Sequence, residues 1–210
     1  MALIKLQVVD LFQGDHVKDF KKAADFGIVG VIHKATTGAT GTDKEYADRR
    51  GPATAAGLLW GAYHWGAHAN VADQVDNFLT AAKPDEQTLV ALDFEETAGN
   101  QMTLDQAREF LTLVGQKLGR KPVLYSGNVI KEGLGAVADP FFGSHRLWLA
   151  QYGEPTVQKS WSNFWLWQYT DRQSGFQPNQ VPGLPGDDEG NLDCNSYDGT
   201  PAQLKADWAS

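Results

Sequence analysis

The sequence predicts a single α/β domain whose parallel sheet closes into an irregular barrel. Short β-rich runs alternate with amphipathic stretches through the first two-thirds of the 210 residues, and about three further strands follow without a full helix between them. No linker, repeat or low-complexity segment interrupts this order. Because 210 residues suit one domain with a sizeable core, we expect residues 1–210 to form a single domain.

The first three strand–helix units follow one another directly. Each strand is rich in β-branched or aromatic residues, and each helix shows amphipathic spacing. The strands are expected at 6–11, 28–35 and 58–65, and the helices at 17–26, 44–56 and 71–82. The first helix is expected to end at Gly27, and the second to be interrupted at Gly51-Pro52.

The fourth unit has the clearest pattern. The apolar run of Thr88–Glu95 fits a strand that is buried on both faces. In the helix that follows, Thr103 and Gln106 form a capping box and Gly119 ends the helix. A fifth strand is expected at 122–126.

The last third of the chain does not follow this alternation of strands and helices. Strands are expected at 146–152, 163–170 and 191–195, with a short final helix from Pro201. The segment 173–190 is rich in Pro, Gly and Asp and is expected to be a long loop within the domain.

The composition narrows the classes of function. The net charge of −8 argues against nucleic acid and against an anionic membrane surface as partners. One cysteine, Cys194, allows no intramolecular disulfide, and we expect it to be buried as a small apolar residue. The first ten residues are too polar for a signal peptide, and no run is long enough to span a membrane.

Four acids fall at predicted strand ends, where barrel proteins place their functional groups. They are Asp10, Asp93, Glu95 and Asp193. On a strand, Asp93 and Glu95 would point to the same face, roughly 6.5–7 Å apart at the backbone. Two carboxyl groups held this close do not both ionise freely, so we expect one to have a raised pKa. Glycosidic cleavage needs this pairing of an acid with a negative group.

Aromatic and amide side chains accompany these acids at the predicted strand ends. Such groups stack on sugar rings and bind hydroxyls, although filling the core is an equally good reading for Trp148 and Trp165. The set comprises Tyr63, His64, Tyr125, Trp148, Gln151, Tyr152, Trp167, Gln168 and Tyr169.

Eight short segments in order resemble the glycoside hydrolase family 25 lysozymes, the Chalaropsis-type muramidases. They are VVDLFQGD (8–15), IHKATTG (32–38), GAYHW (61–65), LDFE (92–95), LYS (124–126), LWLAQY (147–152), WQYT (167–170) and VPG…NLDCN (181–195). The resemblance runs from about Val8 to Asn195. It implies a (β/α)5β3 barrel, similar to a TIM barrel, that hydrolyses the β-1,4 bond between N-acetylmuramic acid and N-acetylglucosamine.

The resemblance also implies roles for individual residues. Glu95 matches the general acid/base, and Asp93 matches the carboxylate that assists the N-acetyl group of the substrate or stabilises the transition state. We expect the substrate to be bound by Asp10, Asp193, Tyr63, Tyr125, Gln168, Lys34 and Trp148. No cofactor or metal is implied. Departures at Leu11, Phe12 and Thr37 affect the expected substrate preference more than the catalytic pair.

Two other kinds of function remain open. The four acids suit a divalent cation in a metal-dependent hydrolase, and His64 and His68 have a spacing that suggests zinc, although the Glu of H-E-x-x-H is absent. A peptidoglycan-binding module that lost its chemistry is the alternative without catalysis. A serine or cysteine nucleophile is disfavoured because no G-x-S-x-G occurs and Cys194 has no evident His partner, while His33 and His145 are expected to be structural.

As a muramidase, the chain would have bacterial peptidoglycan as its partner. We expect a monomeric catalytic domain without a separate wall-binding module. It would be made in the cytoplasm and reach the wall through phage lysis or a secretion machine.

Overall fold

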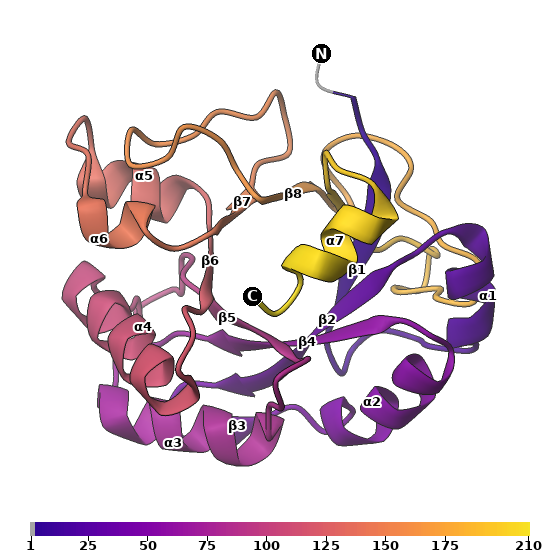
Figure 1. Cartoon of the computed structure of the whole chain (residues 1–210), viewed down its shortest axis with the longest axis horizontal. Helices are drawn as coiled ribbons and strands as arrows, with labels where there is room; N and C mark the ends of the chain where they lie inside the picture. Colours follow the sequence, from indigo (N-terminus) through magenta and orange to yellow (C-terminus); the bar gives the residue numbers. More distant parts are fainter. Residues whose placement is uncertain (1–2) are drawn as a thin grey trace.

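A computed structural model describes residues 3–210 as a closed barrel surrounded by helices (Figure 1). Residues 1 and 2, included in the expected domain, lie outside the described residues. The strands are β1 (Leu6–Leu11), β2 (Gly30–Thr37), β3 (Gly41–Thr42), β4 (Leu59–Trp65), β5 (Leu89–Asp93), β6 (Val123–Ser126), β7 (Leu147–Ala150), β8 (Leu166–Asp171) and β9 (Asp193–Ser196). The helices are α1 (Phe20–Phe26), α2 (Tyr46–Ala55), α3 (Val71–Ala82), α4 (Leu104–Leu118), α5 (Asn128–Leu134), α6 (Pro140–Gly143) and α7 (Pro201–Asp207).

The sheet closes because β1 pairs with both β2 and β9. Across residues 3–210 the order is β1-β9-β8-β7-β6-β5-β4-β2, and the two-residue β3 extends β2 as a hairpin. Five strands are followed by helices and three more complete the barrel, which confirms the expected (β/α)5β3 architecture. Figure 1 shows α1 to α4 arranged around the outside of the barrel.

The last strand corrects the expectation of an all-parallel sheet. β9 runs antiparallel to both β1 and β8, whereas the other neighbours in the closed barrel are parallel. The reason is the long loop after β8, which keeps the chain at the mouth of the barrel, so that β9 starts there. Asp193 is therefore at the beginning of its strand, and not at the carboxyl end.

Several expected helix boundaries also change. Helix α1 begins at Phe20 instead of residue 17, because the Asp19 side chain accepts hydrogen bonds from the backbone of Lys21 and Lys22 and so caps the helix there. Helix α2 continues through Pro52 without the expected interruption. A helix after the fifth strand was implied by the expected architecture but not located, and the short α6 was not predicted. Helix α3 has the expected bounds, and the capping box and final glycine of α4 are both present.

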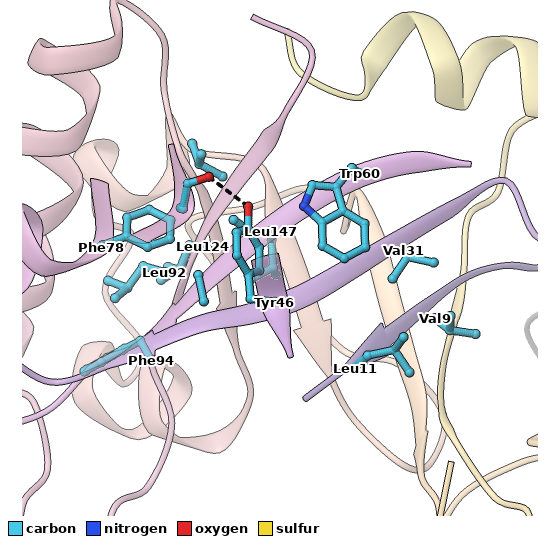
Figure 2. Packing of buried hydrophobic residues seen from close by; sticks show 14 of the residues in the cluster. Val9, Leu11, Val31, Tyr46, Trp60, Phe78, Leu92, Phe94, Leu124 and Leu147 are labelled. Atoms are coloured by element: carbon cyan, nitrogen blue, oxygen red, sulfur yellow. Dashed lines mark hydrogen bonds between the residues drawn. The ribbon is translucent and has the colours of Figure 1, made fainter. Parts of the chain in front are cut away.

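The core has two layers, set by the alternation of side chains along each strand. Outward-facing residues pack under the helices, including Val9 and Leu11 on β1, Leu92 on β5 and Phe94 directly after β5 (Figure 2). Inward-facing residues, including Leu89 and Ala91, fill the barrel itself.

Helix α7 covers the end of the barrel where the parallel strands begin. The Trp208 indole, 2% exposed, donates a hydrogen bond to the Trp60 carbonyl at 2.8 Å. Its ring lies so close to Gly30 that a Cβ there would be 2.6 Å away. No helix within residues 3–210 is both long enough and apolar enough to cross a membrane.

Candidate active site

Inward-facing residues at one end of the barrel meet at an open pocket of about 370 Å³. It lies at the carboxyl ends of the parallel strands, where such barrels place their chemistry. Its lining is made of acids, aromatic rings, one amide and two basic residues: Asp10, Phe12, Lys34, Tyr63, Trp65, Asp93, Glu95, Tyr125, Trp148, Tyr152, Gln168, Asp171, Arg172 and Asp193. The nine residues singled out from the sequence are all among them.

Strand alternation explains how five of these side chains converge. Tyr63, Asp93, Tyr125, Trp148 and Gln168 occupy inward positions near the ends of β4, β5, β6, β7 and β8. Their immediate neighbours along each strand face the helices. Five adjacent strands thus each supply one polar or aromatic group to the same space.

The catalytic pair is held differently from the expectation. Strand β5 ends at Asp93, so Glu95 lies in the loop beyond it instead of on the strand. The Phe94 amide still donates to the Tyr125 carbonyl at 2.9 Å, and the Ser126 hydroxyl donates to the Phe94 carbonyl at 2.6 Å. These bonds fix the residue between the two acids, so that both side chains reach the pocket.

Burial raises the pKa values of both acids. Asp93 is 3% exposed, and its pKa lies well above the ordinary range because of burial and then the charge of Glu95, with Lys34 acting in the opposite direction. Burial also raises the pKa of Glu95 to about 7, against the effects of the adjacent Tyr125 hydroxyl and Lys34. A carboxyl group with such a pKa is able to donate a proton near neutral pH.

One oxygen of Asp93 lacks a hydrogen-bond partner among the described residues. Its Oδ1 atom is buried and has no hydrogen-bond partner within residues 3–210. Buried acceptors are normally satisfied, so an unpaired oxygen here favours the protonated form of Asp93, in keeping with its raised pKa.

Asp10 is held within a network of amides. Gln168 Nε2 lies 3.0 and 3.1 Å from its two carboxyl oxygens, and Asn195 Nδ2 lies 2.7 Å from Oδ1. Asn195 in turn accepts a hydrogen bond from the Trp148 indole at 2.6 Å. Burial and then the charge of Asp193 raise the pKa of Asp10 to about 8, while these hydrogen bonds favour its ionised form.

Lys34 places a positive charge among aromatic rings at the wall of the pocket. Its Nζ atom lies 4.2 Å from the ring centre of Trp65, 5.4 Å from that of Phe12 and 5.8 Å from that of Tyr63. Burial lowers the pKa of Lys34, and nearby carboxylates, led by Asp93, oppose this effect.

Arg172 is a pocket residue that the sequence reasoning missed. It contacts Asp193 at 2.6 Å and the buried Asp15 at 2.7 Å, and its guanidinium lies 5.0 Å from the ring centre of Phe12. Burial raises the pKa of Asp193 to about 6, with Arg172 opposing the rise. The available signal was a basic residue two positions beyond the predicted strand end at Thr170. Trp65 and Asp171 were also missed, whereas Tyr152 was named among the aromatic residues at predicted strand ends but not among the residues expected to bind substrate.

Other residues considered from the sequence lie outside the pocket lining. His64 faces the helices, where it contacts Thr36 and Gln74, while His68 contacts Gln106, so the two do not form a pair. Cys194 is buried, as expected. Leu11 belongs to the outer core, whereas Phe12 lines the pocket. No group of three or more His, Cys, Asp or Glu in residues 3–210 is arranged to hold a metal ion.

Comparisons with known proteins agree with this geometry. The family model described as glycosyl hydrolases family 25 matches residues 9–176. A bacterial lysozyme structure from Streptomyces coelicolor has a TM-score of 0.84 at 22% identity and covers 99% of both chains. A muramidase structure from Acremonium alcalophilum has a TM-score of 0.80 at 24% identity, covering 96% of this chain and 98% of the other. At these identities the structures establish the fold.

A sequence relative is the uncharacterized protein YegX of Escherichia coli O157:H7. It is 29% identical over 156 residues, which cover 71% of this chain and 52% of YegX. This chain therefore spans about half the length of the curated relatives it matches.

Proposed function

The chain belongs to glycosyl hydrolase family 25, and we propose that it is a muramidase that cleaves the β-1,4 bond between N-acetylmuramic acid and N-acetylglucosamine in peptidoglycan. The observation that carries the proposal is the pair formed by the buried Asp93 and the half-buried Glu95 at the barrel mouth. The two carboxyl groups have different surroundings, so they can take the two different roles that acid-assisted glycosidic cleavage requires.

Glu95 serves as the general acid and then the general base. With a pKa near 7, it is protonated often enough to donate to the leaving glycosidic oxygen. After departure of the leaving sugar, the resulting carboxylate accepts a proton from the attacking water. This exchange returns Glu95 to its protonated form.

Asp93 orients the acetamido group of N-acetylmuramic acid. Its carboxyl group accepts the acetamido N–H, which directs the acetamido oxygen toward the anomeric carbon as an internal nucleophile. The nearby ammonium of Lys34 partly opposes the rise in the pKa of Asp93 that burial and the charge of Glu95 cause. This route predicts that N-deacetylated glycan, which lacks the acetamido oxygen, is not cleaved at a comparable rate.

The rest of the pocket suits a sugar chain. Phe12, Trp65 and Tyr152 offer ring faces and hydroxyl or indole groups along an open wall. Such surfaces bind neutral sugar rings by stacking, which does not depend on bulk charge attraction in a chain of net charge −8.

Digestion of insoluble peptidoglycan tests the proposal. The wild-type protein, the Glu95→Gln variant and the wild type with excess chelator are incubated in parallel, and released fragments are identified by mass spectrometry. We expect disaccharide-peptides with reducing N-acetylmuramic acid ends, absent with the variant and unaffected by chelator. Loss on chelation would favour a metal-dependent hydrolase, and wall binding without fragments would favour a binding module.

A further inference from the structure

Arg172 joins three segments of the chain at the rim of the pocket. From the loop after β8, its Nη1 atom lies 2.7 Å from Asp15 Oδ1, and its Nη2 and Nε atoms lie 2.6 and 3.0 Å from Asp193 Oδ2. The guanidinium also lies 5.0 Å from the ring centre of Phe12. Each guanidinium nitrogen therefore has a partner within the protein, which favours a role in placing other side chains.

The backbone of Arg172 has a conformation that ordinarily favours glycine. Its φ angle is +79°, in a tight turn in which the Asp171 N–H donates to the Ser174 carbonyl at 3.2 Å. The Arg172 N–H donates to the Thr170 hydroxyl at 3.2 Å, and its carbonyl accepts from the Asn179 amide at 2.9 Å. The chain keeps an arginine where the backbone disfavours a side chain, and such positions point to a functional side chain.

Asp15 connects the charge of Arg172 to the position of Phe12. The Asp15 side chain is 0% exposed, its Oδ2 atom accepts the Phe12 N–H at 2.7 Å, and its own N–H donates to the Phe12 carbonyl at 3.0 Å. A carboxylate buried in this way depends on its paired cation, which is Arg172. The Phe12 ring packs against Gly14, where a Cβ would lie 2.4 Å from it. Arg172 thus holds both the turn that carries Phe12 and the ring itself.

Asp193 is the second carboxyl group that Arg172 holds. It lies opposite Asp10 on the neighbouring strand β1, and two ionised carboxylates at such positions repel each other. The contacts with Arg172 favour the ionised form of Asp193, against the effect of burial. The other titratable groups that act with Asp193 come from the neighbouring strands and loops and are Asp10, Asp15, Tyr63, Glu95, Asp171 and Cys194.

We propose that Arg172 is a positioning residue that fixes Phe12 and Asp193 as one preformed wall of the pocket. That this wall binds glycan rests on the proposed function, whereas the contacts themselves belong to the free protein. A wall that is already ordered lowers the cost of binding. Loss of Arg172 should therefore weaken substrate binding more than it slows the chemical step.

The first test is the titration of Asp193 in the free protein, followed by carboxyl ¹³C NMR and assigned by loss of its signal in Asp193→Asn. The pKa of Asp193 is about 6, and Arg172→Met should raise it by about one unit or more, because a hydrogen-bonded positive charge is removed. Hydrogen exchange of the Phe12 amide should become at least about tenfold faster, because Asp15 loses the cation that stabilises the turn.

Kinetics on soluble glycan strands from peptidoglycan separate binding from chemistry. Arg172→Met should raise KM about fivefold and change kcat by less than about twofold, because it disturbs an aromatic wall and not the catalytic pair. Phe12→Leu should show a similar division between KM and kcat. The double variant Phe12→Leu/Arg172→Met should be less impaired than the product of the two single effects, because both changes act on one wall.

Arg108→Met is the matched control. Arg108 lies outside the pocket lining, but it has the same kinds of contact, at 2.6 Å from Asp139 and 4.6 Å from the ring centre of Phe141. Its replacement should leave KM and the pKa of Asp193 unchanged. Asp15→Asn/Arg172→Met removes the buried charge together with its partner, so it keeps the titration decisive if Arg172→Met alone fails to fold.

An unchanged pKa of Asp193 in these Arg172 variants would overturn the proposal, and so would equal effects in Arg108→Met. A fall in kcat with an unchanged KM would also overturn it, because Arg172 would then act on the chemical step. If the wild-type protein releases no peptidoglycan fragments, the proposed function fails. The titration and the amide exchange need no substrate, so they still decide whether Arg172 fixes this wall.

Discussion

Replacing Glu95 by Gln is expected to stabilise the fold above pH 7, although it removes the proposed acid. Burial raises the pKa of Glu95 from 4.5 to about 7, so the folded protein holds this proton more tightly than the unfolded chain does. Ionisation therefore destabilises the fold progressively as pH rises from 4.5, and the full penalty is present above pH 7. Gln resembles the protonated side chain and avoids this penalty.

The size of the effect follows from the difference between the pKa of Glu95 in the unfolded chain, 4.5, and in the folded protein, about 7. At 1.36 kcal/mol per unit it corresponds to roughly 3 kcal/mol, and solvent reaching the partly exposed side chain reduces this to roughly 2 kcal/mol. For a domain of this size, that raises the melting temperature by about 4–8 °C. Near pH 4.5 the wild type and the variant should differ little.

Urea and thermal unfolding at pH 4.5 and pH 8 measure this difference directly. Glu96→Gln is the matched control, because Glu96 is exposed and its replacement should change stability by less than about 0.5 kcal/mol at either pH. A Glu95→Gln variant that is no more stable than the wild type at pH 8 would refute the reasoning. An equal gain at both pH values would refute it as well.

Two other substitutions test the pocket. Asn195→Leu should reduce the free energy of unfolding by about 3 kcal/mol, because the buried Trp148 indole and Asp10 each lose a hydrogen-bond partner. Urea unfolding measures this loss. A loss below about 1 kcal/mol would contradict the assigned contacts. Lys34→Met should raise the pKa of Glu95 and move the alkaline limb of kcat/KM to higher pH by roughly half a unit, because a nearby positive charge is removed. An unmoved or lowered limb would show that Lys34 does not act on Glu95.

Much of the fold was accessible from the sequence because local patterns determine it. The capping box at Thr103 and Gln106 marked the start of α4 correctly, and the apolar run before Asp93 indicated a strand buried on both faces. The alternation of side chains also brings Tyr125 and Gln168 into the same pocket.

What the sequence did not reveal depends on tertiary contacts or on weak local signals. The direction of β9 depends on the long loop after β8, which ends at the mouth of the barrel. No periodicity within residues 193–196 indicates this direction. Helix α5 begins at Asn128, and its N-cap residue Gly127 has no side chain to cap it, while α6 has only four residues. The contacts of Arg172 with Asp15 and Asp193 join segments distant in sequence, so residue type alone did not mark them.

Cleavage of peptidoglycan in H₂¹⁸O tests the central claim most directly, because water labels the anomeric carbon at which the bond is broken. The wild-type protein is predicted to place ¹⁸O at the reducing end of N-acetylmuramic acid, and Glu95→Gln to place almost none. Label at reducing N-acetylglucosamine or at a peptide terminus would contradict the proposed bond. Undiminished labelling by Glu95→Gln would contradict the role of Glu95.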